Sequence, residues 1–150
     1  MVKNVFKKLG KKQKNNKGFS LVELIVVIAI MAVLVGVLAP QLMKYVEKSR
    51  EATDIQNCDS IASSLKAYYS DKEDQTADVE IVIEGTGITT GASDAAIVDS
   101  GLTGAKLKGK NWTSITITYT PSNGSVSYTI AGGDDAYYKV DENDAGKFIK

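Results

Sequence analysis

A long apolar stretch near the start of the chain limits what it can fold into more than any other feature. From Leu24 to Ala39 no side chain is polar, and the stretch is followed by Pro40. A helix from Phe19 to Met43 would be about 37 Å long, which exceeds a bilayer core of about 30 Å. The segment therefore predicts a helix that spans a membrane.

One carboxylate interrupts this pattern. Glu23 lies at the start of the apolar stretch. A charged side chain costs about 3 kcal/mol at the centre of a membrane helix and less toward an end. We therefore expect Glu23 to have a function; the alternative is a side chain that merely extends to the lipid head groups.

The chain has a formal net charge of +0, but the charges are unevenly distributed. Residues 1–18 hold seven of the 18 basic side chains and no acid, so 11 basic and 18 acidic side chains remain in residues 19–150. This balance gives no support for nucleic-acid binding by bulk charge. The lysines of residues 1–18 instead fit a segment that stays in the cytoplasm.

Two ordinary explanations of the apolar stretch leave features unexplained. A cleaved secretory signal could be cut after Val37-Leu38-Ala39, but Pro40 would then follow the cut bond and make a poor substrate. A plain membrane anchor explains the length and the lysines. It explains neither Glu23 nor Gly18, the glycine just before the apolar block.

The order of basic residues, Gly18, Phe19, Glu23, an apolar run and Pro40 resembles the class III signal of type IV prepilins and related pseudopilins. This resemblance covers roughly the first half of the chain. It implies that a prepilin peptidase cuts between Gly18 and Phe19 and methylates the new amine of Phe19. Glycine suits the cut bond because it leaves the backbone accessible.

Cleavage would create a positive charge one helical turn before Glu23. Residues 19 and 23 are four positions apart and share one helix face. The amine can therefore pair with Glu23 of its own subunit or of a neighbour, and the resemblance implies the second arrangement. Apolar helices gain no hydrophobic energy by meeting in lipid, so such a pair would supply direction and register to assembly.

Gly36 and Pro40 mark a weak point in the expected helix. Proline cannot donate to the carbonyl four residues earlier, and that residue is Gly36, a poor helix former. A static kink is one interpretation. The family resemblance implies another, in which this segment melts locally when subunits pack into a filament.

After Met43 the helical pattern continues but becomes amphipathic. We expect one helix from about residue 20 to about 70, with its second half packed on a sheet. The apolar stripe comprises Ile55, Cys58, Ala62, Leu65 and Tyr69. Most charged residues are expected on other faces; they include Glu47, Glu51, Asp54 and Asp59.

Two segments alternate with the period of a strand, at 114–119 and 126–130, and Pro121-Ser122-Asn123-Gly124 between them predicts a hairpin. Weaker strand signals lie at 79–83 and 137–140, and residues 85–109 are rich in glycine with two short helical signals.

The fold class is therefore α+β, with a long N-terminal helix packed on a small antiparallel sheet. The expected parts are a removable leader at 1–18, a transmembrane and polymerisation helix at 19–43 and a globular head at 44–150. The head divides into helix at about 44–70, a variable region at about 71–111 and the sheet at about 112–150.

Several kinds of chemistry have little support. The chain has no histidine, which is the commonest general base and metal ligand, and one cysteine, so an intramolecular disulfide is impossible. The acids at 134–144 do not have the spacing of a calcium loop and are read as a solvated surface. We expect no enzymatic activity, no metal and no cofactor.

These observations predict a structural subunit of an extracellular type IV pilus, supporting adhesion, motility or aggregation. It would cross the cytoplasmic membrane once before assembly and lie in the extracellular pilus afterwards. By resemblance, its partners are other copies in a homopolymer, the prepilin peptidase, an assembly ATPase and a platform membrane protein. Two alternatives are a pseudopilin of a type II secretion or competence DNA-uptake apparatus, and a membrane-tethered binding domain that never polymerises.

Overall fold

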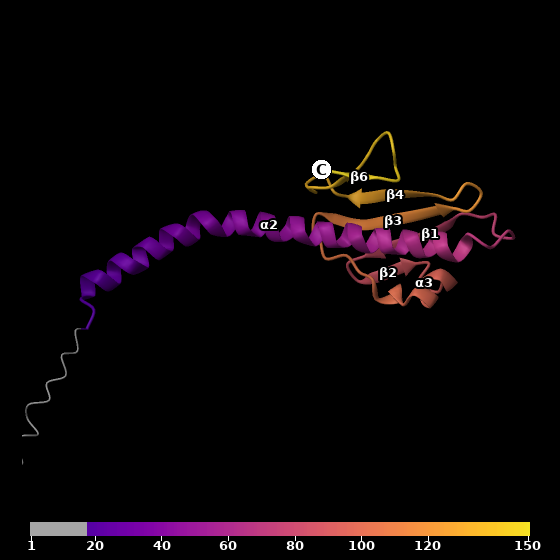
Figure 1. Ribbon diagram of the computed structural model, residues 1–150. Coiled ribbons are helices and arrows are strands. Elements are labelled where there is room, and N and C mark those ends of the chain that lie inside the picture. Colours follow the sequence, from indigo (N-terminus) through magenta and orange to yellow (C-terminus); the bar gives the residue numbers. More distant parts are fainter. Residues whose placement is uncertain (1–17) are drawn as a thin grey trace, which may run out of the picture. The chain divides into compact units, whose positions relative to one another are not determined.

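The computed structural model describes residues 18–150, so the predicted basic leader lies outside the described residues apart from Gly18 (Figure 1). The chain divides into two units, Met1–Pro40 and Gln41–Lys150, and each is described by itself. Helix α2, Leu21–Tyr69, contributes its first part to one unit and its second part to the other.

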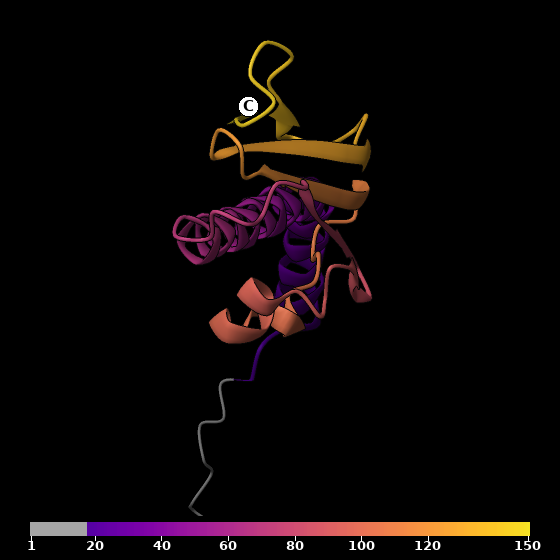
Figure 2. The ribbon, with the colours of Figure 1, turned by 90° about the vertical axis from the view of Figure 1, so that its right-hand side faces the viewer.

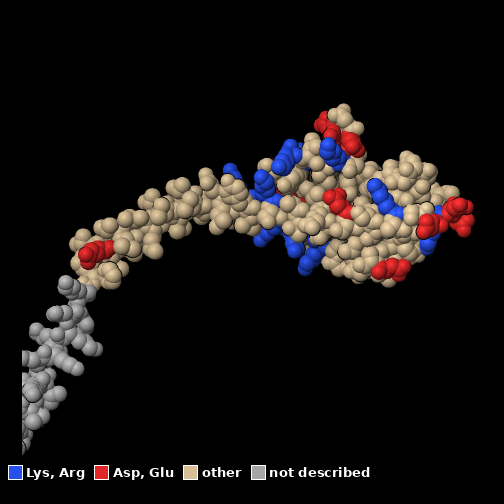
Figure 3. Space-filling model, in the orientation of Figure 1, with Lys and Arg blue, Asp and Glu red and all other residues tan. Residues whose placement is uncertain are grey.

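In the first unit, the described chain is almost entirely helical. The helix begins at Leu21 and includes Pro40, and it is long and apolar enough to cross a membrane. The apolar segment appears in Figure 3 as a continuous uncharged surface after the single acidic patch at its start. Its large apolar side chains are exposed, because nothing in this unit packs on them.

The second unit is the predicted α+β head. Four strands form an antiparallel sheet in the order β2-β1-β3-β4, and the second part of α2 lies along this sheet (Figures 1 and 2). The bounds are β1 Val79–Glu84, β2 Gly87–Thr90, β3 Trp112–Thr120 and β4 Ser125–Gly132. The fold class predicted from the sequence is confirmed.

The central strand explains why the sheet forms. Strand β3 alternates between apolar and hydroxyl side chains, so one face buries Ile115, Ile117 and Tyr119 while the other stays polar. Its register places Ile117 opposite Ile81 of β1 and Tyr128 of β4. The predicted hairpin is also confirmed.

The hairpin turn depends on glycine. Gly124 has a φ of +68°, a left-handed conformation that favours glycine, and its N–H donates to the carbonyl of Thr120 at 2.9 Å. The Asn123 side chain accepts a bond from the N–H of Ser125 at 2.9 Å. Local turn chemistry thus fixes the pairing of β3 with β4.

The glycine-rich middle of the chain is ordered into short elements. After β2 come helix α3, Ala95–Ser100, and a single 3-10 turn, η1, Leu102–Gly104. The Asp94 side chain caps α3 by accepting from the N–H of Ala96, and it also accepts from the hydroxyl of Tyr69 at 2.7 Å. This region is therefore attached to the end of α2, and it lies on the opposite side of that helix from β4 (Figure 2).

The C-terminal segment forms a small sheet of its own. Strand β5, Lys139–Val140, pairs with β6, Phe148–Ile149. The weak strand signal at 137–140 is thus confirmed in part, as a two-residue strand outside the main sheet. Phe148 contacts Tyr128 of β4, with ring centroids 4.7 Å apart, and so covers the edge of the core.

One continuous core joins the helix, the sheet and α3. Cys58 lies in this core, as its place on the apolar stripe predicts. The largest fully buried apolar side chains are Ile61, Leu65, Ile81, Ile83, Ile97, Ile115 and Ile117.

Replacing a side chain at the centre of this core tests the packing. We expect Ile117→Ala to lower the free energy of unfolding of the head by about 2–5 kcal/mol, through lost burial and the resulting cavity. The matched control is Val98→Ala, whose side chain is 53% exposed. It should change stability by less than about 0.5 kcal/mol. Thermal unfolding of the full chain in detergent measures both, and equal effects would contradict the described core.

Candidate functional site

The N-terminal motif begins with a reciprocal pair of hydrogen bonds. The backbone N–H of Ser20 donates to Glu23 Oε2 at 2.7 Å, and the backbone N–H of Glu23 donates to Ser20 Oγ at 3.1 Å. This is a capping box, which satisfies N–H groups that have no partner inside the first turn of a helix. This capping box was not predicted from the sequence, although the Ser-x-x-Glu spacing at 20–23 is its signature.

The capping box gives Glu23 a local structural role in the described chain. A capping box accepts Gln as well as Glu at this position, so the role does not require a negative charge. If the negative charge of Glu23 is needed, the reason must therefore be an interaction with a group outside the capping box. The predicted pairing of Glu23 with the amine of Phe19 in a neighbouring copy stays a prediction.

The proposed cleavage point lies before the helix. Gly18 and Phe19 are outside regular structure and exposed, and the side chain of Phe19 is 89% exposed. A bond in an exposed segment outside regular structure is accessible to a peptidase. Gly36 and Pro40, the predicted weak point, both lie within the described helix, and local melting there stays a prediction.

The second half of α2 corrects the sequence analysis. Glu51 and Asp54 were expected with most charged residues on faces other than the apolar stripe, but both are 0% exposed and lie on the same face as Cys58 and Leu65. The apolar stripe continues toward the N-terminus as a stripe of carboxylates at 47, 51 and 54, with the same spacing of three and four. This spacing was the signal that the sequence analysis overlooked.

Asp54 binds a loop through three hydrogen bonds. Its carboxylate accepts from the backbone N–H of Lys108 at 2.8 Å, from that of Gly109 at 2.7 Å and from the indole Nε1 of Trp112 at 3.0 Å. A Cβ at Gly109 would lie 2.8 Å from that same indole nitrogen, so only glycine allows this approach. The buried charge is thus fully hydrogen-bonded.

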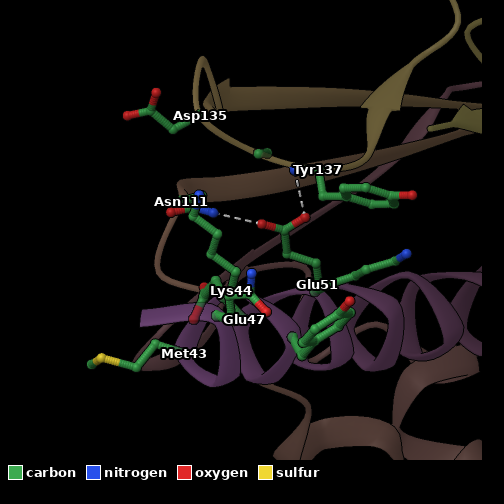
Figure 4. Close-up of a pocket in the computed structure, with 11 residues that line it drawn as sticks. Met43, Lys44, Glu47, Glu51, Asn111, Asp135 and Tyr137 are labelled. Carbon is green, nitrogen blue, oxygen red and sulfur yellow. Dashed lines mark hydrogen bonds between the residues drawn. The ribbon is translucent and has the colours of Figure 1, made fainter. Parts of the chain in front are cut away.

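Glu51 binds two further loops (Figure 4). One oxygen accepts from the amide of Asn111 at 2.7 Å, and the other accepts from the backbone N–H groups of Tyr137 at 2.8 Å and Tyr138 at 3.2 Å. Glu51, Asn111 and Tyr137 border an open pocket of about 850 Å³. Through these hydrogen bonds, Glu51 connects the loops before β3 and before β5 to helix α2.

Glu47 and Asp59 extend the same pattern at the edges. Glu47 accepts from the backbone N–H of Lys110 and lies 3.6 Å from the Arg50 guanidinium. Asp59 accepts from the hydroxyl of Tyr128 at 2.9 Å, and burial together with this contact raises the pKa of that hydroxyl. Four acids of one helix thus hold the loops and edge strand of the head.

The described residues show neither a metal site nor a reactive thiol. Within residues 18–150, no group of three or more histidine, cysteine, aspartate or glutamate side chains is placed to hold a metal ion. Burial and the nearby Asp54 raise the pKa of Cys58 to about 12. At neutral pH this thiol is protonated and a weak nucleophile.

Comparisons with known proteins agree with the N-terminal motif. Residues 13–39 match the prokaryotic N-terminal methylation motif. The fimbrial protein EcpC of Eikenella corrodens is 27% identical over 136 residues, covering 81% of this chain and 86% of that protein. The type IV major pilin protein PilA of Myxococcus xanthus is 29% identical over 58 residues, which are 39% of this chain and 26% of that protein.

A third relative matches a similar share of the chain. The prepilin peptidase-dependent protein A of Clostridium perfringens is 38% identical over 64 residues, covering 41% of this chain and 46% of that protein. No solved structure matches the chain significantly. The motif and these relatives confirm the resemblance of the N-terminal segment to that of type IV prepilins, and the relatives are named as fimbrial, pilin and prepilin peptidase-dependent proteins.

The buried carboxylate of Asp54 can be tested by an isosteric change. In Asp54→Asn, an amide group replaces one acceptor oxygen and faces N–H donors. We expect a loss of about 1.5–3 kcal/mol for each hydrogen bond broken. Thermal unfolding measures the loss of stability. Fluorescence of Trp112, the single tryptophan, shows whether the environment of its indole ring beside residue 54 has changed. Asp59→Asn is the control, since an exposed amide oxygen still accepts from Tyr128; an equal loss there would contradict the assigned role of Asp54.

The thiol of Cys58 offers a pH-dependent test. Because burial raises its pKa from 9.0 to about 12, the folded chain holds this proton more tightly than the unfolded chain. Its contribution to stability is present below pH 9.0 and is lost as pH rises toward about 12. At pH 9, iodoacetamide should label the denatured chain and leave the folded chain unlabelled, as mass spectrometry would show. Rapid labelling of the folded chain would contradict this burial.

Proposed function

We propose that this protein is a structural subunit of an extracellular type IV pilus. The chain is inserted in the cytoplasmic membrane, cut after Gly18 and methylated at the amine of Phe19. It then polymerises through the first part of α2, and the heads cover the fibre. Prepilin peptidase, an assembly ATPase and a platform membrane protein act on it, and the fibre supports adhesion, motility or aggregation.

The observation that supports this proposal most is the uncovered apolar helix surface. Every large apolar side chain from Leu21 to Met43 is at least 49% exposed in the isolated chain. So much apolar surface is not stable in water and must contact lipid or other apolar helices. A membrane covers it before assembly, and the same segments of neighbouring subunits cover it in a fibre.

The position of Glu23 supports polymerisation over a simple anchor. Its capping role would be filled by a neutral glutamine, which is cheaper to place in lipid. A carboxylate is useful if a positive group approaches it, and the amine created at Phe19 is such a group. A tethered binding domain has no need for this charge.

The mature N-terminus gives a direct test. Mass spectrometry of the protein from cells should find a chain that begins at Phe19 and is heavier by one methyl group. A chain that still begins at Met1, or that begins beyond Pro40, would overturn the proposal. Long surface fibres containing this subunit would exclude a pseudopilin that serves a secretion or DNA-uptake apparatus.

Two substitutions separate the charge of Glu23 from its capping role. Glu23→Gln keeps the capping box and removes the charge, whereas Ser20→Ala removes the cap, at about 1 kcal/mol, and keeps the charge. We expect Glu23→Gln to reduce sheared fibres to less than about a tenth of wild type, because an unpaired partner in a dry charge pair costs about 2–5 kcal/mol.

Ser20→Ala is the control and should still form fibres. Fibre yield is measured by electron microscopy and blotting of the sheared fraction, with cleavage after Gly18 checked by mass. Normal fibres from Glu23→Gln together with a defect in Ser20→Ala would assign Glu23 to helix capping alone.

A further inference from the structure

The charged side chains of the head are distributed unequally between its two ends. Figure 3 shows most basic side chains over the end where α2 enters the head and a cluster of acidic ones at the far end, where basic side chains also lie; further acidic side chains lie on a loop at the top of the head. One end contains residues 44–51 of α2, and the other contains residues 66–76, where α2 ends at Tyr69 and the chain continues as a turn. From Lys48 to Tyr69 the helix rises about 32 Å, so the two groups of charges lie far apart.

The basic collar, as we name it, consists of Lys44, Lys48, Lys108 and Lys110. Lys44 and Lys48 come from the helix, and the loop carrying the other two is held there by its N–H bonds to Asp54 and Glu47. Lys44, Lys108 and Lys110 are exposed, and Lys48 lies 4.0 Å from the ring centroid of Tyr137.

The acids near the collar are largely engaged in contacts within the head. Glu51 is buried and bonded to backbone and amide groups, while Glu47 is bonded to the Lys110 N–H and lies next to Arg50. Asp135 remains exposed on the border of the pocket. Lys44 and Lys48 of the basic collar border an open pocket of about 850 Å³, which Glu47, Glu51 and Asp135 also line.

The acidic turn, as we name it, is Asp71–Asp74 at the far end of the head. Asp71, Glu73 and Asp74 are exposed. The ammonium of Lys72 is folded back over the ring of Tyr68, 3.5 Å from its centroid, so it points toward the helix end rather than outward. The turn thus projects three carboxylates from one end of the head.

We infer that the acidic turn of one copy docks on the basic collar of the next copy along the fibre. This contact deepens the proposed function and rests on it. In a polymer of parallel subunits, each copy contacts the next through two different surfaces, and the head carries opposite charges at its two ends. Charge complementarity of this kind sets register and suppresses wrong contacts.

Charge reversal tests the contact in the full chain. The collar variant is Lys44→Glu with Lys110→Glu, and the turn variant is Asp71→Lys with Glu73→Lys. Each alone should lower the yield of sheared fibres about tenfold, because like charges then face each other. The chain carrying all four changes should recover most of the wild-type yield, since attraction is restored with the signs exchanged.

Matched controls reverse the same number of charges at residues outside the basic collar and the acidic turn. They are Lys106→Glu with Lys147→Glu for the collar and Asp99→Lys with Glu142→Lys for the turn, and all four residues are exposed. Both controls should form fibres like wild type. Thermal unfolding of each variant in detergent shows whether its head is folded.

Each outcome decides the proposal. Fibres of normal yield from both end variants, or a quadruple variant as defective as they are, would overturn the contact. A defect in the collar variant alone would instead favour a role of the lysines at an anionic lipid surface and would also overturn it. If wild type forms no fibres, the proposed function fails and the contact fails with it; if wild-type fibres form, only the contact is at stake.

Discussion

One face of α2 organises the head. In its last part this face is apolar, with Ile61 and Leu65 packed against the central strands, and in its earlier part it is acidic, with Glu51 and Asp54 fully buried. The apolar part gains free energy from burial, at about 25 cal/mol per Å². The acidic part orders chain segments that have no regular structure, because each carboxylate collects N–H groups that would otherwise lack partners.

This arrangement lets the head manage without a disulfide. The chain's single cysteine is buried in the core, so the C-terminal half has no covalent cross-link. The loop before β5 is held by Glu51, and the edge of the sheet is held by the contact of Tyr128 with Asp59 and Phe148. Carboxylates on a rigid helix thus supply the local restraint that a cross-link would otherwise give.

The same helix has a different requirement in its first part. There every large apolar side chain is exposed in the isolated chain, so no other described part of the chain buries this apolar surface. Its start is stabilised locally by the Ser20–Glu23 capping box. The exposed apolar surface of this part of the helix is what the proposed function uses, because lipid and then neighbouring subunits would cover it.

The sequence by itself determined the membrane-like segment, the α+β class, the β3–β4 hairpin and the burial of Cys58. These features depend on local periodicity and turn chemistry, which a single chain displays directly. Even the capping box at 20–23 was present as a local pattern. Only the tertiary structure decided that Glu51 and Asp54 are buried, because their N–H partners lie more than fifty residues away along the chain. A carboxylate appears solvent-facing in a sequence, and its burial becomes favourable only when folding brings enough donors around it.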